Sequence, residues 1–190
     1  MALKTVSMST GGGLFTAGWH ELEISKAKYG VFEGPNGNKR YLDIWFKDYP
    51  DNMNLRVYES FNKTTKDEWK IANIFKFANA GIAGVLKDPT GKQAIQFDDE
   101  AEGLLGKRIN AFFYKETKTG NDYTRIFDSI APVEQEGEHL SFTDKQVGSI
   151  KQSVENQYNK SLDYTSDNNV ASFGASTESA TNAETKDMPW

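Results

Sequence analysis

The sequence has 190 residues, which is enough for one domain with a buried core and too few for two large ones. It contains no Cys and only two His, which lie far apart; this excludes a disulfide scaffold, a thiolate metal site, a Cys nucleophile and a His-rich metal site. Met1–Thr10 lacks the apolar segment of a signal peptide, and no run of about 18 apolar residues could span a bilayer. These features predict a cytoplasmic protein that contacts no membrane and needs no cofactor.

Charged and aromatic residues are distributed unevenly along the chain. The net charge is -5, but residues 1–133 carry a net charge of +1 and residues 134–190 a net charge of -6. Only five of the 24 aromatic residues lie beyond Val133. The sequence therefore predicts a flexible N-terminal arm at residues 1–16, an aromatic-rich and nearly neutral domain at residues 17–133, and an acidic C-terminal extension.

The first part of the domain alternates apolar and polar residues, which is typical of half-buried strands. Gly18–Lys28 is the first predicted strand, and a loop rich in Gly follows at Gly30–Asn38. Lys39–Lys47 is the clearest strand, and Met53–Phe61 is the third. The alternation predicts that five residues of these last two strands point inward, namely Leu42, Ile44, Phe46, Leu55 and Val57.

The second part begins with helical spacing. Asp67–Ala80 places its apolar residues on one face, and Gly81 is positioned to end that helix. Three further strands are predicted at Gln93–Phe97, Lys107–Lys115 and Asn121–Ile130, the last two as a hairpin. Three strands, a helix and a strand hairpin are the element order of an OB fold, a five-stranded Greek-key β-barrel. The predicted fold class is therefore mainly β, with one helix between strands three and four.

The acidic extension is predicted to have two parts. Residues 134–160 form a linker in which Thr143–Lys160 is an amphipathic helix that begins at a capping box of Thr143 and Gln146. Its apolar face carries Val147, Ile150, Val154 and Tyr158. Residues 161–190 are rich in Ser, Thr, Asn, Ala and acidic residues, which bury too little apolar surface to fold, so we expect a disordered tail.

Aromatic and basic residues share the outward side of the second and third strands. If these strands pair as an antiparallel hairpin, one patch contains Lys39, Tyr41, Trp45, Lys47, Arg56 and Tyr58. Single-stranded nucleic acid requires this combination, because bases stack on flat rings while Lys and Arg neutralise phosphates. The alternative is that a helix covers these rings, or that the inward and outward faces are reversed.

Two loops are expected to flank this patch. Phe32 lies in the first loop, and Lys115, Lys118 and Arg125 lie in or near the turn of the second hairpin. Glycine-rich loops with basic or aromatic residues can close over a nucleic-acid strand, so these four residues join the predicted DNA-binding set.

No motif indicates catalysis. Gly11-Gly12-Gly13 precedes no helix, as a phosphate-binding loop would require. The acidic run Asp98–Glu102 lacks the spacing and the turn glycine of an EF-hand loop, which favours a solvated loop. We therefore expect neither catalytic nor metal-binding residues, and a protein that is not an enzyme.

The domain and tail together resemble the single-stranded DNA-binding proteins of bacteria and especially of bacteriophages. Lys39–Lys47 and Leu105–Val133 look like strand segments of such phage proteins, and the acidic tail ends in Pro and an aromatic residue. The resemblance implies an OB-fold protein that protects single strands in DNA replication, recombination or repair. It also implies that replication or recombination proteins dock on the last four residues, Asp187, Met188, Pro189 and Trp190.

Two other functions stay open at the level of sequence. A non-catalytic β-barrel that binds carbohydrate or protein would also expose aromatic rings. A hydrolase would require two carboxylates that converge in a pocket. The sequence does not distinguish DNA from RNA, because stacking and phosphate contacts do not read the 2′-hydroxyl group.

Overall fold

The computed structural model describes residues 15–35, 37–64, 66, 68–87, 91 and 93–173, with side chains as far as residue 162 except at position 93. The predicted tail motif at residues 187–190 and nearly all of the predicted N-terminal arm lie outside these residues. The chain divides into two units, residues 1–155 and 156–190. None of the described helices is long and apolar enough to cross a membrane.

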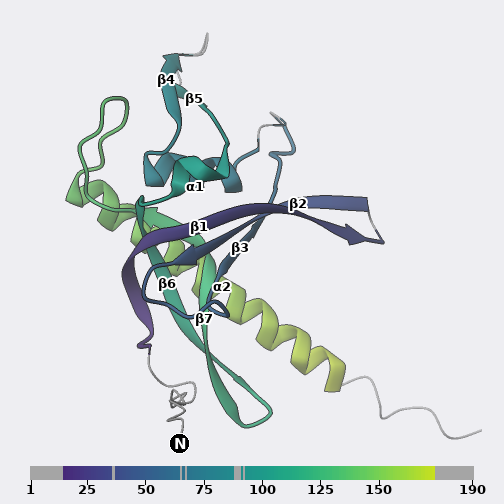
Figure 1. Ribbon diagram of the computed structural model, residues 1–190. Coiled ribbons are helices and arrows are strands. Elements are labelled where there is room, and N and C mark those ends of the chain that lie inside the picture. The colour runs from purple at the N-terminus through teal and green to yellow at the C-terminus, as the bar shows by residue number, and fades with distance from the viewer. Residues whose placement is uncertain are drawn as a thin grey trace, which may run out of the picture. The chain divides into compact units, whose positions relative to one another are not determined.

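Five antiparallel strands form the main sheet, in the order β3-β2-β1-β6-β7 (Figure 1). Their bounds are β1 Gly18–Gly34, β2 Gly37–Phe46, β3 Leu55–Tyr58, β6 Arg108–Lys118 and β7 Asn121–Pro132. A second sheet contains β4 (Ile82–Lys87) and β5 (Gln93–Phe97). Helix α1 (Lys70–Ala78) lies between β3 and β4 in the chain, and the short helix η1 (Ala101–Leu104) precedes β6. The mainly β class is thus confirmed; among the described residues no strand pairing joins β3 to β7 to close a barrel.

Strand β1 pairs with two partners in succession. Its first part, Gly18–Glu23, pairs with β6, and its second part, from Ile24 to Gly34, pairs with β2. A β-bulge lies between Ile24 and Lys26, where the partner changes. Bulges bend a strand and increase its twist, which lets β1 serve both halves of the sheet. Beyond the bulge, the β1–β2 hairpin projects from the rest of the sheet (Figure 1).

The core lies where α1 and the inward residues of the sheet meet. The five inward residues predicted for the second and third strands are all buried, which confirms this alternation. From α1, Ile71, Ile74 and Phe75 are buried in the same cluster. A helix of nine residues is unstable alone in water, so burial of this apolar face stabilises it.

The ends of α1 differ from the prediction. The helix begins at Lys70 because the Glu68 carboxylate accepts hydrogen bonds from the backbone N–H groups of Ile71 (2.9 Å) and Ala72 (2.7 Å). It ends at Ala78 because Asn79 adopts the left-handed conformation, with φ 49° and ψ 49°. The predicted stop at Gly81 is therefore wrong by two residues.

The strand boundaries also need correction. The segment predicted as the first loop, Gly30–Asn38, is largely strand: β1 continues to Gly34 and β2 begins at Gly37. The third strand, β3, ends at Tyr58 and not at Phe61. The strand β4, which pairs with the predicted Gln93–Phe97 strand, is absent from the prediction.

Helix α2 runs from Asp144 to Phe173. Its predicted capping box is present, since the Thr143 N–H donates to Gln146 Oε1 (2.9 Å) and the Gln146 N–H donates to Thr143 Oγ1 (3.4 Å). Val147 and Val154 are buried, as the predicted apolar face requires. The helix continues past the predicted end at Lys160, so Ser161–Phe173 is helical where the sequence favours disorder.

Candidate nucleic-acid interface

The hairpin of β1 and β2, together with β3, has one face turned away from the core, which we call the outer face. Strand pairing arranges its side chains in four cross-strand rows, because alternate residues of a strand lie on the same side of a sheet. From the base of the hairpin to its tip, the rows are Lys26 with Trp45; Lys28 with Asp43 and Arg56; Gly30 with Tyr41 and Tyr58; and Phe32 with Lys39. Five of the six residues predicted from the second and third strands, all except Lys47, are therefore brought together here. Phe32, which was predicted in a loop, lies on the same face in strand β1.

Three aromatic rings adjoin one another near the tip of the outer face. The ring centres of Tyr41 and Tyr58 are 5.8 Å apart, and those of Phe32 and Tyr58 are 6.2 Å apart, both edge to face. Phe32 is 48% exposed and Tyr58 is 38% exposed. Each of the three rings comes from a different strand, so the cluster depends on the register of the sheet.

Arg56 is neutralised by Asp43. The two side chains form a bidentate ion pair, with Nε–Oδ1 and Nη2–Oδ2 distances of 2.7 Å. The sequence places Asp43 on the outward side, yet it is buried, because Arg56 covers it. The hydrogen bonds to Asp43 raise the pKa of Arg56 above its ordinary value. The Arg56 guanidinium also lies 4.1 Å from the centre of the Tyr41 ring, a cation–π contact that holds the two side chains together.

Three lysines complete the outer face, and the sequence prediction missed two of them. Lys26 lies over the half-buried Trp45 ring, with its Nζ 4.5 Å from the ring centre. Lys28 and Lys39 are exposed, and neither has an ion-pair partner among the described residues. A strict alternation from the buried Leu22 and Ile24 would place Lys26 and Lys28 on the inward side; the β-bulge between Ile24 and Lys26 reverses the alternation and turns them to the outer face.

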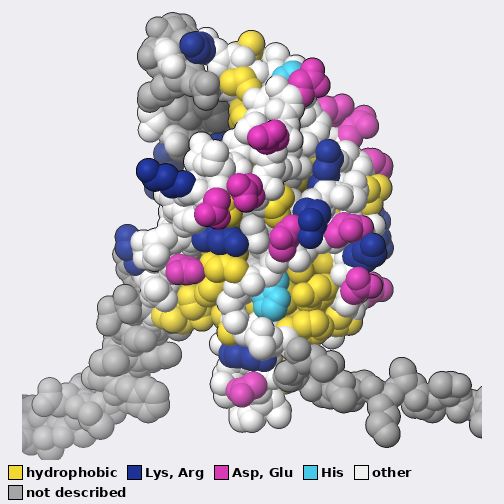
Figure 2. Space-filling view, turned by 90° about the vertical axis from the view of Figure 1, so that its left-hand side faces the viewer, with side chains coloured by type: hydrophobic (Ala, Val, Ile, Leu, Met, Phe, Trp, Pro, Cys, Tyr) yellow, Lys and Arg dark blue, Asp and Glu magenta, His cyan; other side chains and the backbone are white. Residues whose placement is uncertain are grey.

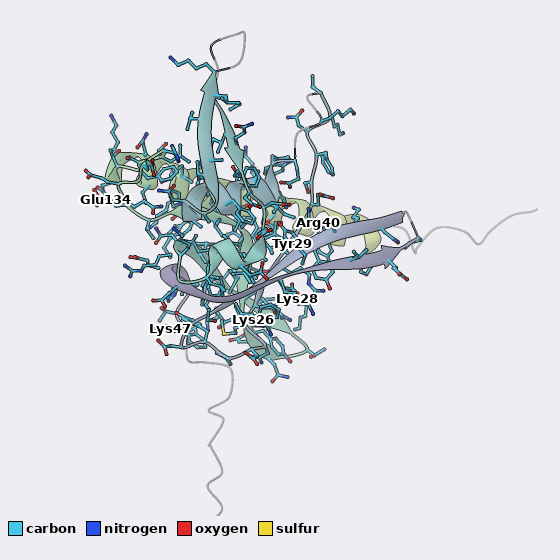
Figure 3. The ribbon with its side chains drawn as sticks, turned by 45° about the horizontal axis from the view of Figure 1, so that its top comes forward. Lys26, Lys28, Tyr29, Arg40, Lys47 and Glu134 are labelled. Atoms are coloured by element: carbon cyan, nitrogen blue, oxygen red, sulfur yellow. The ribbon has the colours of Figure 1, made fainter. Side chains whose placement is uncertain are left out.

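The opposite face of the hairpin carries a cluster that the sequence did not indicate. Arg40 lies 3.7 Å from the centre of the Tyr29 ring and pairs with Asp99 at 2.9 Å. Figure 3 shows Tyr29 and Arg40 next to each other on the two strands of the hairpin. Burial is the main reason that the pKa of Tyr29 is raised. The cluster joins the hairpin to the segment before η1.

Four residues of the predicted set lie elsewhere. Lys47 is 3.4 Å from Glu23 and lies far from Arg40 in Figure 3. On the β6–β7 hairpin, Lys115 donates to Thr124 Oγ1 (2.8 Å), while Lys118 and Arg125 both pair with Glu116. The hydrogen bond from Lys118 is the main reason that the pKa of Glu116 is lowered. The tips of the β6–β7 and β1–β2 hairpins project in different directions (Figure 1).

The side of the molecule turned away from the tip of the β1–β2 hairpin has mixed charge. Figure 2 shows Lys and Arg side chains interspersed with Asp and Glu over this side. Within the part of the chain that the structure describes, no group of three or more His, Asp or Glu residues could hold a metal ion. This mixture of charges contrasts with the outer face, where Lys28 and Lys39 have no ion-pair partner among the described residues.

Comparison with known proteins adds no relative. No protein-family model matches the sequence, and no curated protein is significantly similar to it.

Proposed function

We propose that the protein binds single-stranded DNA, without sequence preference, on the outer face of β1, β2 and β3. The observation that carries the proposal is the cluster of Phe32, Tyr41 and Tyr58 beside two lysines, Lys28 and Lys39, that lack acidic partners. Exposed rings supply stacking surfaces for bases, at roughly 1 to 3 kcal/mol per base, whatever the base. The lysines supply charges for phosphates, which carry no sequence information.

The proposal includes an OB fold for the domain. Its support is the element order, with three strands, a helix and a final β6–β7 hairpin, between which β4, β5 and η1 are inserted, and the double pairing of β1 with β2 and β6. OB domains bind oligonucleotides on the face around their second and third strands, which corresponds to the outer face. Pairing of β3 with β7 is the one contact that would close the barrel.

In this account the protein has no catalytic role. It protects single strands during DNA replication, recombination or repair, in the cytoplasm of the host cell if it is a phage protein. The four terminal residues, Asp187, Met188, Pro189 and Trp190, recruit replication or recombination proteins, as the resemblance of the tail implies. A Trp behind a rigid Pro suits an anchor residue, while the acidic residues steer the encounter.

Fluorescence anisotropy of a labelled oligothymidylate tests the binding proposal. Unlabelled single-stranded DNA should displace the probe much better than duplex DNA or a neutral oligosaccharide. The logarithm of affinity should fall with the logarithm of salt concentration, by about 0.7 for each phosphate contact. Displacement by the oligosaccharide, or affinity that is independent of salt, would favour a carbohydrate-binding or protein-binding module instead.

A pull-down from host or phage lysate tests the role of the tail. Intact protein and the Trp190→Ala variant are compared, and replication or recombination proteins should be lost from the variant. Identical bound proteins would contradict docking through Trp190. Oligothymidylate affinity should be equal in the two proteins, because the change removes no charge.

A further inference from the structure

The tip of the β1–β2 hairpin contains a small open pocket of about 230 Å³. Two of its walls are the rings of Phe32 and Tyr58, whose planes stand at 82° to each other. A flat ligand in this corner could stack on one ring while it meets the edge of the other, and both are favourable aromatic geometries. The remaining lining residues are Gly34, Pro35, Gly37 and Lys39.

The size and charge of this pocket restrict its ligand. Pockets for drug-sized ligands usually have volumes of about 300 to 1,000 Å³, so this one suits a single planar ring. Lys39 stands at the pocket with no acidic partner among the described residues, which favours an anionic ligand. A nucleotide has both features, because its planar base is joined through a sugar to a negatively charged phosphate.

We propose that this corner is a subsite for one nucleotide, with the base stacked on one of the two rings and its edge against the other, and the phosphate on Lys39. The inference rests on the proposed function and extends it. Along the rest of the outer face a base would meet one ring only, whereas at the tip a single base meets two rings that stand at 82° to each other. The subsite therefore fixes one end of the bound strand at the hairpin tip.

Gly34 makes room for the Phe32 ring. A Cβ atom at position 34 would lie 2.9 Å from Phe32 Cε1, too close unless the ring moves. Gly34→Ala should therefore displace the ring without removing an aromatic residue. Gly84 of β4 is the matched control, because an added Cβ there would meet no atom within 4 Å.

Nuclear magnetic resonance titration of the full-length protein tests the subsite with thymidine monophosphate and deoxyribose 5-phosphate as probes. The nucleotide should shift the ring signals of both Phe32 and Tyr58, while the sugar phosphate should leave them nearly unchanged. Gly34→Ala should weaken nucleotide binding about tenfold, and Gly84→Ala should not change it. Equal shifts from the two probes, or equal nucleotide affinity in the two glycine variants, would overturn the subsite.

Anisotropy with oligothymidylate on the same samples separates this inference from the proposed function. If the oligonucleotide binds while the mononucleotide leaves both rings unchanged, the subsite is refuted and the proposed function stands. If neither binds, both are refuted. Circular dichroism of Gly34→Ala establishes that a loss reflects the ring and not unfolding; should that variant unfold, Phe32→Leu replaces it with the same expected loss.

Discussion

The ring of Tyr41 lies across the backbone of Gly30 on the neighbouring strand. A Cβ atom at position 30 would fall 2.4 Å from both the Cζ and the hydroxyl oxygen of Tyr41, so only Gly permits this arrangement. The two residues are directly opposite in the register of β1 and β2. The Tyr41 ring can therefore occupy its position only because Gly30, on the neighbouring strand, has no side chain.

Gly30→Ala should therefore weaken oligothymidylate binding while the fold is kept. The atoms that clash belong to the far end of a side chain, so Tyr41 can swing away at little cost to the sheet. We expect a loss of about tenfold in affinity, the size of one weakened stack. Anisotropy measures the affinity and circular dichroism the fold; Gly84→Ala serves again as the control. Unchanged affinity would mean that the Tyr41 ring contacts no base.

Lys39 and Lys47 should differ in their effect on salt dependence. Lys39 has no acidic partner among the described residues, whereas Lys47 pairs with Glu23 beyond the other end of the strand. Lys39→Ala should therefore flatten the plot of log affinity against log salt by about 0.7, the contribution of one phosphate contact. Lys47→Ala should leave the slope unchanged. A flatter slope for Lys47→Ala together with an unchanged slope for Lys39→Ala would indicate that the phosphates contact the base of the hairpin instead.

The alternation of Lys39–Lys47 was sufficient to predict which side of β2 is buried. Leu42, Ile44 and Phe46 are buried as the alternation predicts. This much could be predicted because a period of two is a local pattern that requires no knowledge of distant residues. The burial of Asp43 could not be predicted in this way, because it depends on the bidentate pair with Arg56 across the sheet. Sequence periodicity predicts which face of the sheet a residue lies on, but only the strand register shows that Asp43 lies opposite Arg56.

Glycine was the main source of error in the candidate site. Gly30 and Gly34 indicated a loop, although both lie in β1, where they make room for Tyr41 and Phe32. Lys26 and Lys28 escape the prediction for a different reason, because the β-bulge between Ile24 and Lys26 reverses the alternation that begins with Leu22 and Ile24. The Arg40–Asp99 pair was beyond sequence reasoning, because the two residues are far apart in the chain.

Arg56→Met should destabilise the protein by about 1 to 3 kcal/mol, because it leaves the Asp43 carboxylate buried without its two charged hydrogen bonds. The Arg56 side chain is 43% exposed, so the loss should be smaller than for a fully buried pair. Urea unfolding measures the difference. The double variant Asp43→Asn with Arg56→Met should recover part of the loss; a single variant within about 0.5 kcal/mol of the native protein would contradict the role of this pair.

Tyr29 should make stability sensitive to alkaline pH. Burial, helped by Asp99, raises the pKa of its hydroxyl above the ordinary value of 10.0. Above that pH the unfolded chain releases a proton that the folded protein retains, so stability should fall as pH rises. Tyr29→Phe should reduce this fall in stability, whereas the control Tyr123→Phe, at an exposed position, should leave it unchanged. Urea unfolding at about pH 9 and 11 measures the effect; an equally steep fall in Tyr29→Phe would show that Tyr29 ionises as freely in the folded state.

Photochemical cross-linking of an oligothymidylate to the full-length protein, followed by mass spectrometry of the linked peptides, tests most directly that the outer face binds the strand. The cross-links should fall on Phe32, Tyr41 and Tyr58, the three rings that adjoin one another on β1, β2 and β3. Cross-links confined to the β6–β7 hairpin or to α1, with none on these rings, would contradict the account.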